Sequence, residues 1–139
     1  MITSAQAIDR IKTRIGVDGP EVTAPVEAGH VRRFVEAIGD RNPRWAQEAP
    51  PTFLVALAPA SVHLNDAEDY GQGWLNGGNR FEYFAPVLIG DQITAKGRIV
   101  DVFDKAGSTG NLLFIVFETD YTNQRGDLVA RLRGTAIRR

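Results

Sequence analysis

The sequence contains no cysteine and only two histidines, His30 and His63. The missing cysteine excludes disulfides, thiolate nucleophiles and thiolate-bound metals, and it fits a reducing compartment, so we expect a cytoplasmic protein. Neither histidine stands in a group of histidine, aspartate and glutamate residues with metal-ligand spacing. We therefore expect no metal site and no cofactor.

Long apolar runs are also missing. No window approaches the roughly eighteen apolar residues of a membrane-spanning helix, and residues 2–16 interleave charged with apolar side chains, unlike a signal peptide. Sixteen Lys and Arg oppose seventeen Asp and Glu, which gives a net charge of −1 and argues against a dedicated nucleic-acid surface. Neither a nucleic acid nor a membrane is expected as a partner.

The chain has enough apolar residues for one folded domain. Of its 139 residues 43% are hydrophobic, so it can bury a core of its own. We expect a single domain over residues 1–139, in which residues 1–25 form an N-terminal helix and an extended connector with one short strand. Apolar side chains recur at helical spacing in residues 4–15, with Ser4 as the N-cap and Gly16 after the end.

Two further helices and a loop follow. Residues 27–38 carry apolar side chains at three- and four-residue steps, and Gly39 offers the left-handed residue that commonly ends a helix. Residues 53–58 are an apolar run preceded by two prolines, which predicts a buried central helix. Residues 65–80 are rich in Gly, Asn and Asp and predict a long loop.

The rest of the chain has the pattern of β-strands. Apolar and polar residues alternate between segments rich in turn residues, which predicts successive antiparallel hairpins. The whole pattern predicts an α+β fold, in which an antiparallel sheet wraps around a long central helix. The expected strands cover residues 80–84, 92–103, 111–121 and 128–138.

Four motifs, in this order, occur in residues 34–43, 49–53, 81–91 and 122–129. They resemble the fatty-acid-synthase-type dehydratase branch of the MaoC-like proteins, and the match runs from about Val26 to the C-terminus. This resemblance implies a hot-dog fold that pairs edge to edge with a second hot-dog chain. It also implies acyl-CoA or acyl-carrier-protein thioesters as substrates. Proteins of this family hydrate trans-2-enoyl thioesters to (R)-3-hydroxyacyl thioesters, or catalyse the reverse reaction.

The sequence departs from the family at its most diagnostic position. In the family pattern Gly-Asp-x-Asn-Pro is followed two residues later by a histidine, and the Asp and His activate one water. Here Asp40, Asn42 and Pro43 match the pattern, but Trp45 replaces the histidine. Since the indole N–H only donates hydrogen bonds, Trp45 cannot exchange a proton with water. Asp40 and Asn42 are therefore candidates for a degenerate catalytic motif, and Asp40 is alternatively a turn residue.

Other candidates are less specific. The backbone N–H groups of Thr52 and Phe53 could polarise a thioester carbonyl, or they simply begin a helix. Arg80 could bind a phosphate of CoA or a carrier protein, as could the terminal arginines Arg131, Arg133, Arg138 and Arg139, unless these are solvated groups that protect an edge strand. His63 or His30 could replace the missing base, although a lone histidine is more often structural.

The resemblance and the lost histidine together favour a non-catalytic subunit. In this interpretation the chain shapes the acyl tunnel and forms a heterodimer or heterotetramer with an Asp/His-bearing MaoC-like chain. Two alternatives stay open: a stand-alone hydratase or thioesterase with a rearranged site, and a non-enzymatic module that binds acyl thioesters. A homodimer also stays open.

Overall fold

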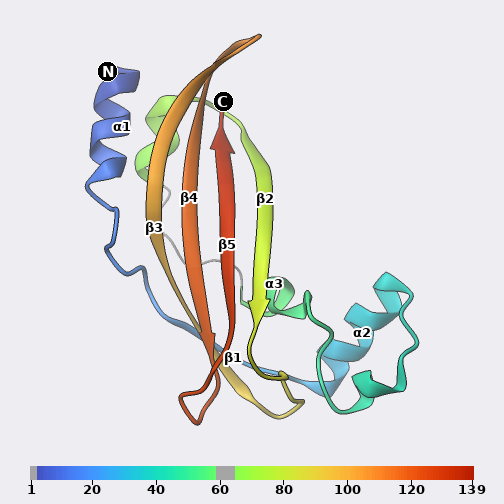
Figure 1. Cartoon of the computed structure of the whole chain (residues 1–139). Helices are drawn as coiled ribbons and strands as arrows, with labels where there is room; N and C mark the ends of the chain where they lie inside the picture. The colour runs from blue at the N-terminus through green and yellow to red at the C-terminus, as the bar shows by residue number, and fades with distance from the viewer. Residues whose placement is uncertain (1–2, 59–64) are drawn as a thin grey trace.

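A computed structural model describes residues 3–58 and 65–139. Its centre is a five-stranded antiparallel sheet with the strand order β1-β3-β4-β5-β2 (Figure 1). The helices lie against this sheet, so the predicted α+β class is confirmed. The strands are β1 (Val22–Pro25), β2 (Trp74–Tyr83), β3 (Gln92–Gly107), β4 (Gly110–Thr122) and β5 (Leu128–Arg138).

The predicted hairpins are confirmed for three of the strands. β3 and β4 are longer than expected, since only Ser108 and Thr109 separate them. A turn joins β4 to β5, and in it the Asn123 side chain accepts hydrogen bonds from the backbone N–H groups of Arg125 and Asp127. β5 has the predicted bounds. Its pairing with β2 places it inside the sheet, so the expectation that its arginines lie on an edge strand is wrong.

The position of β2 differs from the prediction. A hairpin with β3 was expected, but β2 pairs with β5 at the opposite side of the sheet. The segment that connects β2 to β3 is not a tight turn, because backbone hydrogen bonds attach it to other parts of the chain. Phe84 donates to Val129, and the carbonyl of Val87 accepts from Ala49. Such long-range bonds leave no local signal in the sequence.

β2 also begins earlier than predicted. The expected loop over residues 65–80 is wrong, since it contains a 3₁₀ helix, η2 (Asn65–Tyr70), and the first half of β2. The glycines and asparagines that predicted a loop instead form a β-bulge between Asn76 and Gly78. Gly78 has a φ of 138°, and its N–H donates to Asn76 Oδ1 at 2.9 Å.

The first two helices agree closely with the sequence pattern. α1 (Ser4–Lys12) buries Ala7 and Ile11, but its N-cap is Thr3, which forms a capping box with Gln6, rather than Ser4. α2 (Ala28–Ile38) ends as predicted at Gly39, whose φ is 70°. None of the helices within residues 3–58 and 65–139 is long and apolar enough to cross a membrane.

The long central helix is not present among the described residues. α3 (Phe53–Leu57) is five residues long, and Ala58 after it has extended backbone, with φ −144° and ψ 92°. Pro59 follows Ala58 in the sequence. Because a proline ring disfavours helical backbone at the preceding residue, the extended backbone of Ala58 agrees with its place before Pro59.

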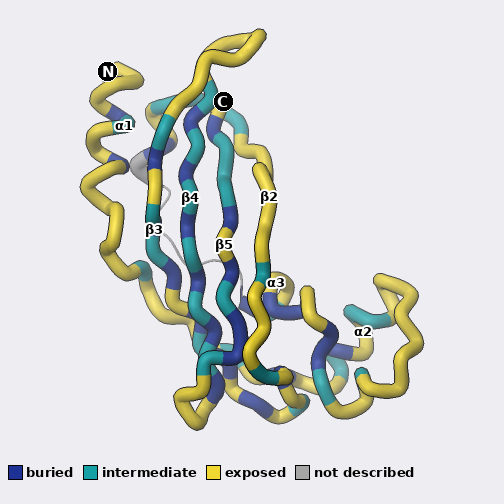
Figure 2. Tube along the Cα trace, viewed as in Figure 1, coloured by how far each residue is buried: buried dark blue, intermediate teal, exposed yellow. Residues whose placement is uncertain are grey.

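The buried residues form two separate clusters, one toward each end of the sheet. In the first, α2 and α3 pack on the ends of β4 and β5, and in the second, α1 and η2 pack on β3 and β4. Alternate residues of β4 take part in both, as Figure 2 shows along that strand. Members of the first cluster include Val31, Phe53, Leu54, Phe117 and Tyr121, and the second consists of Ile11, Ala67, Ile99, Val102, Leu113 and Ile115.

Candidate functional site

The degenerate motif forms a tight turn after α2. Asp40 Oδ1 accepts the N–H of Asn42 at 3.0 Å, and Asn42 Oδ1 accepts the N–H of Arg44 at 3.0 Å. Asn42 thereby caps the 3₁₀ helix η1 (Pro43–Ala46). Both side chains are exposed. Their geometry is that of two successive Asx turns, which a polar side chain makes with the backbone two residues on.

Trp45 lies in η1, half-buried, between two cavities. It lines one of about 270 Å³ with the proline pair before α3, and one of about 410 Å³ with the Asp40 turn. Its buried indole Nε1 has no hydrogen-bond partner among the described residues. A buried donor without an acceptor costs about 1–3 kcal/mol. The residue at the family's histidine position is therefore a bulky wall that cannot accept a proton.

Tyr83 connects this region to the sheet, although the sequence pattern did not single it out. Its hydroxyl donates to the carbonyl of Pro51 at 2.7 Å, and its ring lines the smaller Trp45 cavity. Burial raises the pKa of the Tyr83 phenol. The tyrosine therefore stays a protonated donor at neutral pH and fixes the start of α3 to the last residue of β2.

The residues at the start of α3 have mainly structural contacts. The Phe53 N–H already donates to the Pro50 carbonyl at 3.0 Å, while the Phe53 ring is fully buried and Thr52 is exposed. His30 packs edge-on against the Phe53 ring, with centroids 4.8 Å apart. The structure thus brings His30 to Phe53 and not to Asp40, and His63 lies outside the described residues.

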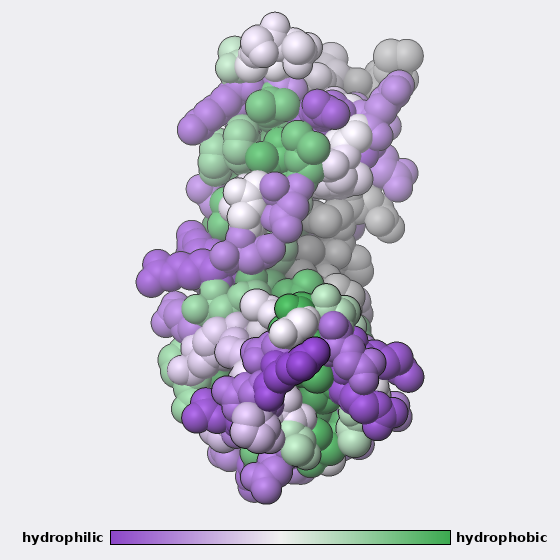
Figure 3. Space-filling view, turned by 90° about the vertical axis from the view of Figure 1, so that its right-hand side faces the viewer, coloured by the Kyte–Doolittle hydropathy of each residue, from purple (hydrophilic) through white to green (hydrophobic). Residues whose placement is uncertain are grey.

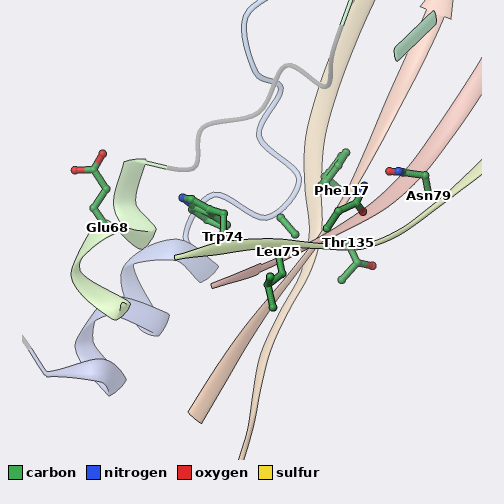
Figure 4. Close-up of a pocket in the computed structure, with 8 residues that line it drawn as sticks. Glu68, Trp74, Leu75, Asn79, Phe117 and Thr135 are labelled. Atoms are coloured by element: carbon green, nitrogen blue, oxygen red, sulfur yellow. The ribbon is translucent and has the colours of Figure 1, made fainter. Parts of the chain in front are cut away.

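A third cavity, of about 410 Å³, lies beside β2 (Figure 4). Trp74 and Asn79 of β2 and Phe117 of β4 line it, together with Glu68, Leu75, Asn76, Thr135 and Ala136. Figure 4 shows Phe117 and Asn79 on one side of β2, with Leu75 and Thr135 on the other. The exposed surface of this lining is mostly apolar, with polar groups from Glu68, Thr135 and two asparagines, and it suits a ligand that is largely hydrocarbon.

Gly134 leaves the space that the ring of Phe117, a residue of the cavity wall, occupies. A Cβ on Gly134 would lie 2.4 Å from Phe117 Cζ, so the phenyl ring occupies the space above β5 where another residue would have a side chain. Phe117 and Gly134 are direct neighbours across β4 and β5. The cavity shares no lining residue with the two at Trp45, so it is a separate feature of the described chain.

The arginines considered as phosphate ligands have different surroundings. Arg131 binds Asp120 at 2.7 Å, and this hydrogen bond raises the pKa of the guanidinium. Arg133 binds Glu118 at 2.8 Å. Arg138 is buried, with its guanidinium 5.0 Å from the centroid of the Trp74 ring. Arg80 is exposed on β2 and lines none of the three cavities.

Comparison with known proteins identifies the family. Residues 13–132 match the model of the FAS1-like dehydratase domain region. A UPF0336 protein of Parafrankia sp. (strain EAN1pec) is 31% identical over 137 residues, which cover 81% of this chain and 87% of that relative.

Solved structures agree with the expected fold. The ChsH1–ChsH2 complex from Mycobacterium tuberculosis contains a chain with a TM-score of 0.78 and 21% identity, covering 97% of this chain and 90% of that one. A chain of the HadBC (3R-hydroxyacyl-ACP dehydratase) complex from the same organism has a TM-score of 0.69 and 23% identity. The match covers 89% of this chain and 98% of that one. The hot-dog fold is therefore confirmed, and the chain belongs to the FAS1-like dehydratase family of MaoC-like hot-dog proteins.

Proposed function

We propose that this chain is the substrate-binding subunit of a MaoC-type enoyl-thioester hydratase or 3-hydroxyacyl-thioester dehydratase. The observation that carries the proposal is Trp45, which fills the histidine position of a family that otherwise pairs Asp with His. Water addition needs a group that takes a proton from water, and an indole cannot do so. The Asp40 carboxylate in addition accepts a hydrogen bond from the backbone N–H of Asn42. The catalytic Asp and His then come from a second hot-dog chain.

The outer edge of β2 is the proposed position of that partner. Within the described ranges no strand pairs with this side of β2. The edge exposes large apolar side chains, and Figure 3, seen from this side, shows apolar surface there. Exposed apolar edge strands tend to pair with another chain. Two of the similar structures, ChsH1–ChsH2 and HadBC, are complexes of two different chains. The exposed residues are Trp74, Leu75, Tyr83 and Phe84.

The cavity beside β2 is the proposed acyl site. It lies along the strand that the partner covers, and Trp74 and Phe117 give it apolar walls. An acyl chain bound there would be shielded from water once the partner is in place. Thr52, Phe53 and Arg80 stay candidates for contacts with the thioester and its CoA or carrier-protein group.

Hydration of crotonyl-CoA tests whether this chain needs a second chain for catalysis. The purified chain alone should give no turnover, and addition of a MaoC-like chain with the intact Gly-Asp-x-Asn-Pro-x-His motif should give activity. Turnover by the homogeneous chain would contradict the subunit proposal in favour of a rearranged site. Release of free CoA would instead identify a thioesterase.

A cavity-filling variant tests the acyl site in the active complex. Ala136→Phe places a ring in the cavity, so we expect KM to rise more for long enoyl-CoA substrates than for crotonyl-CoA. Ala106→Phe is the matched control, because Ala106 is exposed near the β3–β4 turn, away from the cavity lining. Equal kinetics for the two variants on long substrates would place the acyl chain elsewhere.

A further inference from the structure

The face of the sheet that points toward the core has a gap in the row of side chains from β5. Because alternate residues of a strand share a face, the core-facing residues after the buried Leu132 are Gly134, Ala136 and Arg138. Gly134 has no side chain and Ala136 has only a methyl group, so little of β5 rises above the sheet between Leu132 and Arg138. The cavity beside β2 lies over this gap, since Ala136 is part of its lining.

Phe117 of β4 fills one end of the gap. It lies directly opposite Gly134, and a Cβ on that glycine would be only 2.8 Å from Phe117 Cε2 and closer still to Cζ. The phenyl ring therefore lies against the backbone of β5. Phe117 is 9% exposed and belongs, with Leu132, to the first cluster of buried residues. The cavity thus ends at the ring of Phe117, and packed core side chains lie behind that ring.

The other end of the cavity is open in this chain. Trp74 and Leu75 line it there and are 41% and 42% exposed. Asn79 lines the closed end, on the same side of β2 as Phe117 (Figure 4). From Trp74 to Asn79 the cavity follows β2 for roughly 15 Å, at about 3.3 Å per residue of a strand. An acyl chain that enters beside Trp74 therefore meets Phe117 with its methyl end.

We propose that Phe117, seated over Gly134, sets the greatest acyl length that this chain accepts. The inference rests on the acyl site of the proposed function and names the residue at which the acyl group stops. Each methylene that moves from water into the cavity should strengthen binding about fourfold. Further methylenes find no such place, because the core behind Phe117 is close-packed. Affinity should rise with acyl length up to this length limit and then level off.

Two substitutions should move the length limit in opposite directions. Phe117→Leu replaces the ring with a shorter side chain, so the limit should shift to longer acyl groups. Gly134→Ala places a methyl group where the ring now lies, so the ring must turn into the cavity and the limit should shift to shorter acyl groups. Below the limit, the gain per methylene should stay at about fourfold in both variants. A loss of core packing alone would not move the limit.

Fluorescence of Trp74 measures these dissociation constants. Trp74 lines the cavity, and Trp45→Phe leaves it as the only tryptophan in the full chain. Saturated acyl-CoAs from butyryl- to tetradecanoyl-CoA are titrated into this protein and into versions that also contain Phe117→Leu or Gly134→Ala. The matched control is Phe34→Leu, the same substitution next to the same cluster but outside the cavity lining. It should lower the melting temperature and leave the length limit in place.

A length limit that stays unchanged in Phe117→Leu, while acyl-CoA still binds, would overturn the role of Phe117. This result stands even when Gly134→Ala does not fold. Lack of binding at every acyl length would overturn the acyl site, and this inference with it. The crotonyl-CoA assay with an added partner still decides whether the chain needs a second chain for catalysis. Failure of this inference and failure of the proposed function are therefore separable.

Discussion

The two edges of the sheet differ in almost every respect. β1, at one edge, is four residues long and contains Pro25, and nearby Asp18 and Glu21 bind Lys96 of the next strand. β2, at the other edge, is ten residues long, with exposed aromatic residues. Natural proteins block edge strands by making them short and by adding prolines and charges. β1 has these features and β2 largely lacks them, so β2 is the edge open to another strand.

The largest expected effect comes from giving β2 a proline like that of β1. Asn79→Pro removes an outward N–H group, while the N–H groups that bond to β5 stay in place. We expect association with the proposed partner to weaken about a hundredfold. Sedimentation velocity measures the change. Val22→Pro, at the start of β1, is the control and should leave association unchanged; an equal loss there would mean that the two edges do not differ in this way.

A smaller effect is expected from the exposed aromatic residues of the open edge. Phe84 is 52% exposed just after β2. Aromatic anchors at interfaces commonly contribute about 1–2 kcal/mol or more, so Phe84→Ala should weaken association by about that amount without lowering the melting temperature. Calorimetric dilution of the complex measures it. Leu88→Ala, an exposed apolar residue of the β2–β3 connection, is the control; equal losses would argue against an interface centred on β2.

A substitution of Tyr121, which lies in the middle of the sheet, should lower the stability of the fold and leave association unchanged. The Tyr121 hydroxyl donates to the Ala58 carbonyl at 3.0 Å, and burial raises the pKa of the phenol to about 12. The folded pKa of Tyr121 lies above the unfolded value of 10.0. The contribution of this phenol to the free energy of unfolding is therefore complete below pH 10, and it is lost between pH 10 and about 12.

Tyr121→Phe should cost about 1 kcal/mol at neutral pH. It should also flatten the fall in stability above pH 10, with urea unfolding at several pH values as the measurement. Tyr83→Phe is the comparison at the open edge, because Tyr83 is 44% exposed whereas Tyr121 is fully buried. An unchanged pH profile for Tyr121→Phe would mean that other groups cause the alkaline loss.

The smallest effect is expected at the protected edge. Lys96 binds Asp18 at 3.1 Å and Glu21 at 3.8 Å, both in exposed positions. Because water and salt screen such pairs, Lys96→Gln should change thermal stability only slightly, less so in high salt, and should leave association unchanged. A strong loss of association would show that the β1 edge also contacts a partner.

Local features of the fold could be predicted from the sequence, and long-range ones could not. The apolar spacing in α2 and the glycine after it are contained within a dozen residues, so Gly39 was placed correctly. The pairing of β2 with β5 joins residues 47 to 64 positions apart, and no pattern within β2 indicates it. The bulge at Gly78 resembles a loop in composition because both need positive φ. Pro59 was the local signal that the helix beginning at Phe53 ends before it.

The candidate site shows the same difference between local features, which the sequence predicts, and long-range contacts, which it does not. Trp45 was identified because the motif around it is contiguous, whereas Tyr83 reaches Pro51 only through the fold. The terminal arginines were predicted to lie on an edge strand, because the sequence does not reveal that β2 pairs with β5. Nor does it reveal that Asp120 and Glu118 of β4 bind Arg131 and Arg133. Phe117 and Gly134 form the cavity wall through a cross-strand contact, which needs the register of β4 and β5 to be known.

The bulge between Asn76 and Gly78 has a consequence for the lifetime of any complex. A bulge bends a strand and interrupts its ladder, so the straight part of the open edge is confined to residues 79–83. A partner strand can form only a short ladder there, and a short ladder dissociates more readily than a long one. Exchange of the proposed partner should therefore be fast, and the concentrations of the two chains would then set how much of the complex is present.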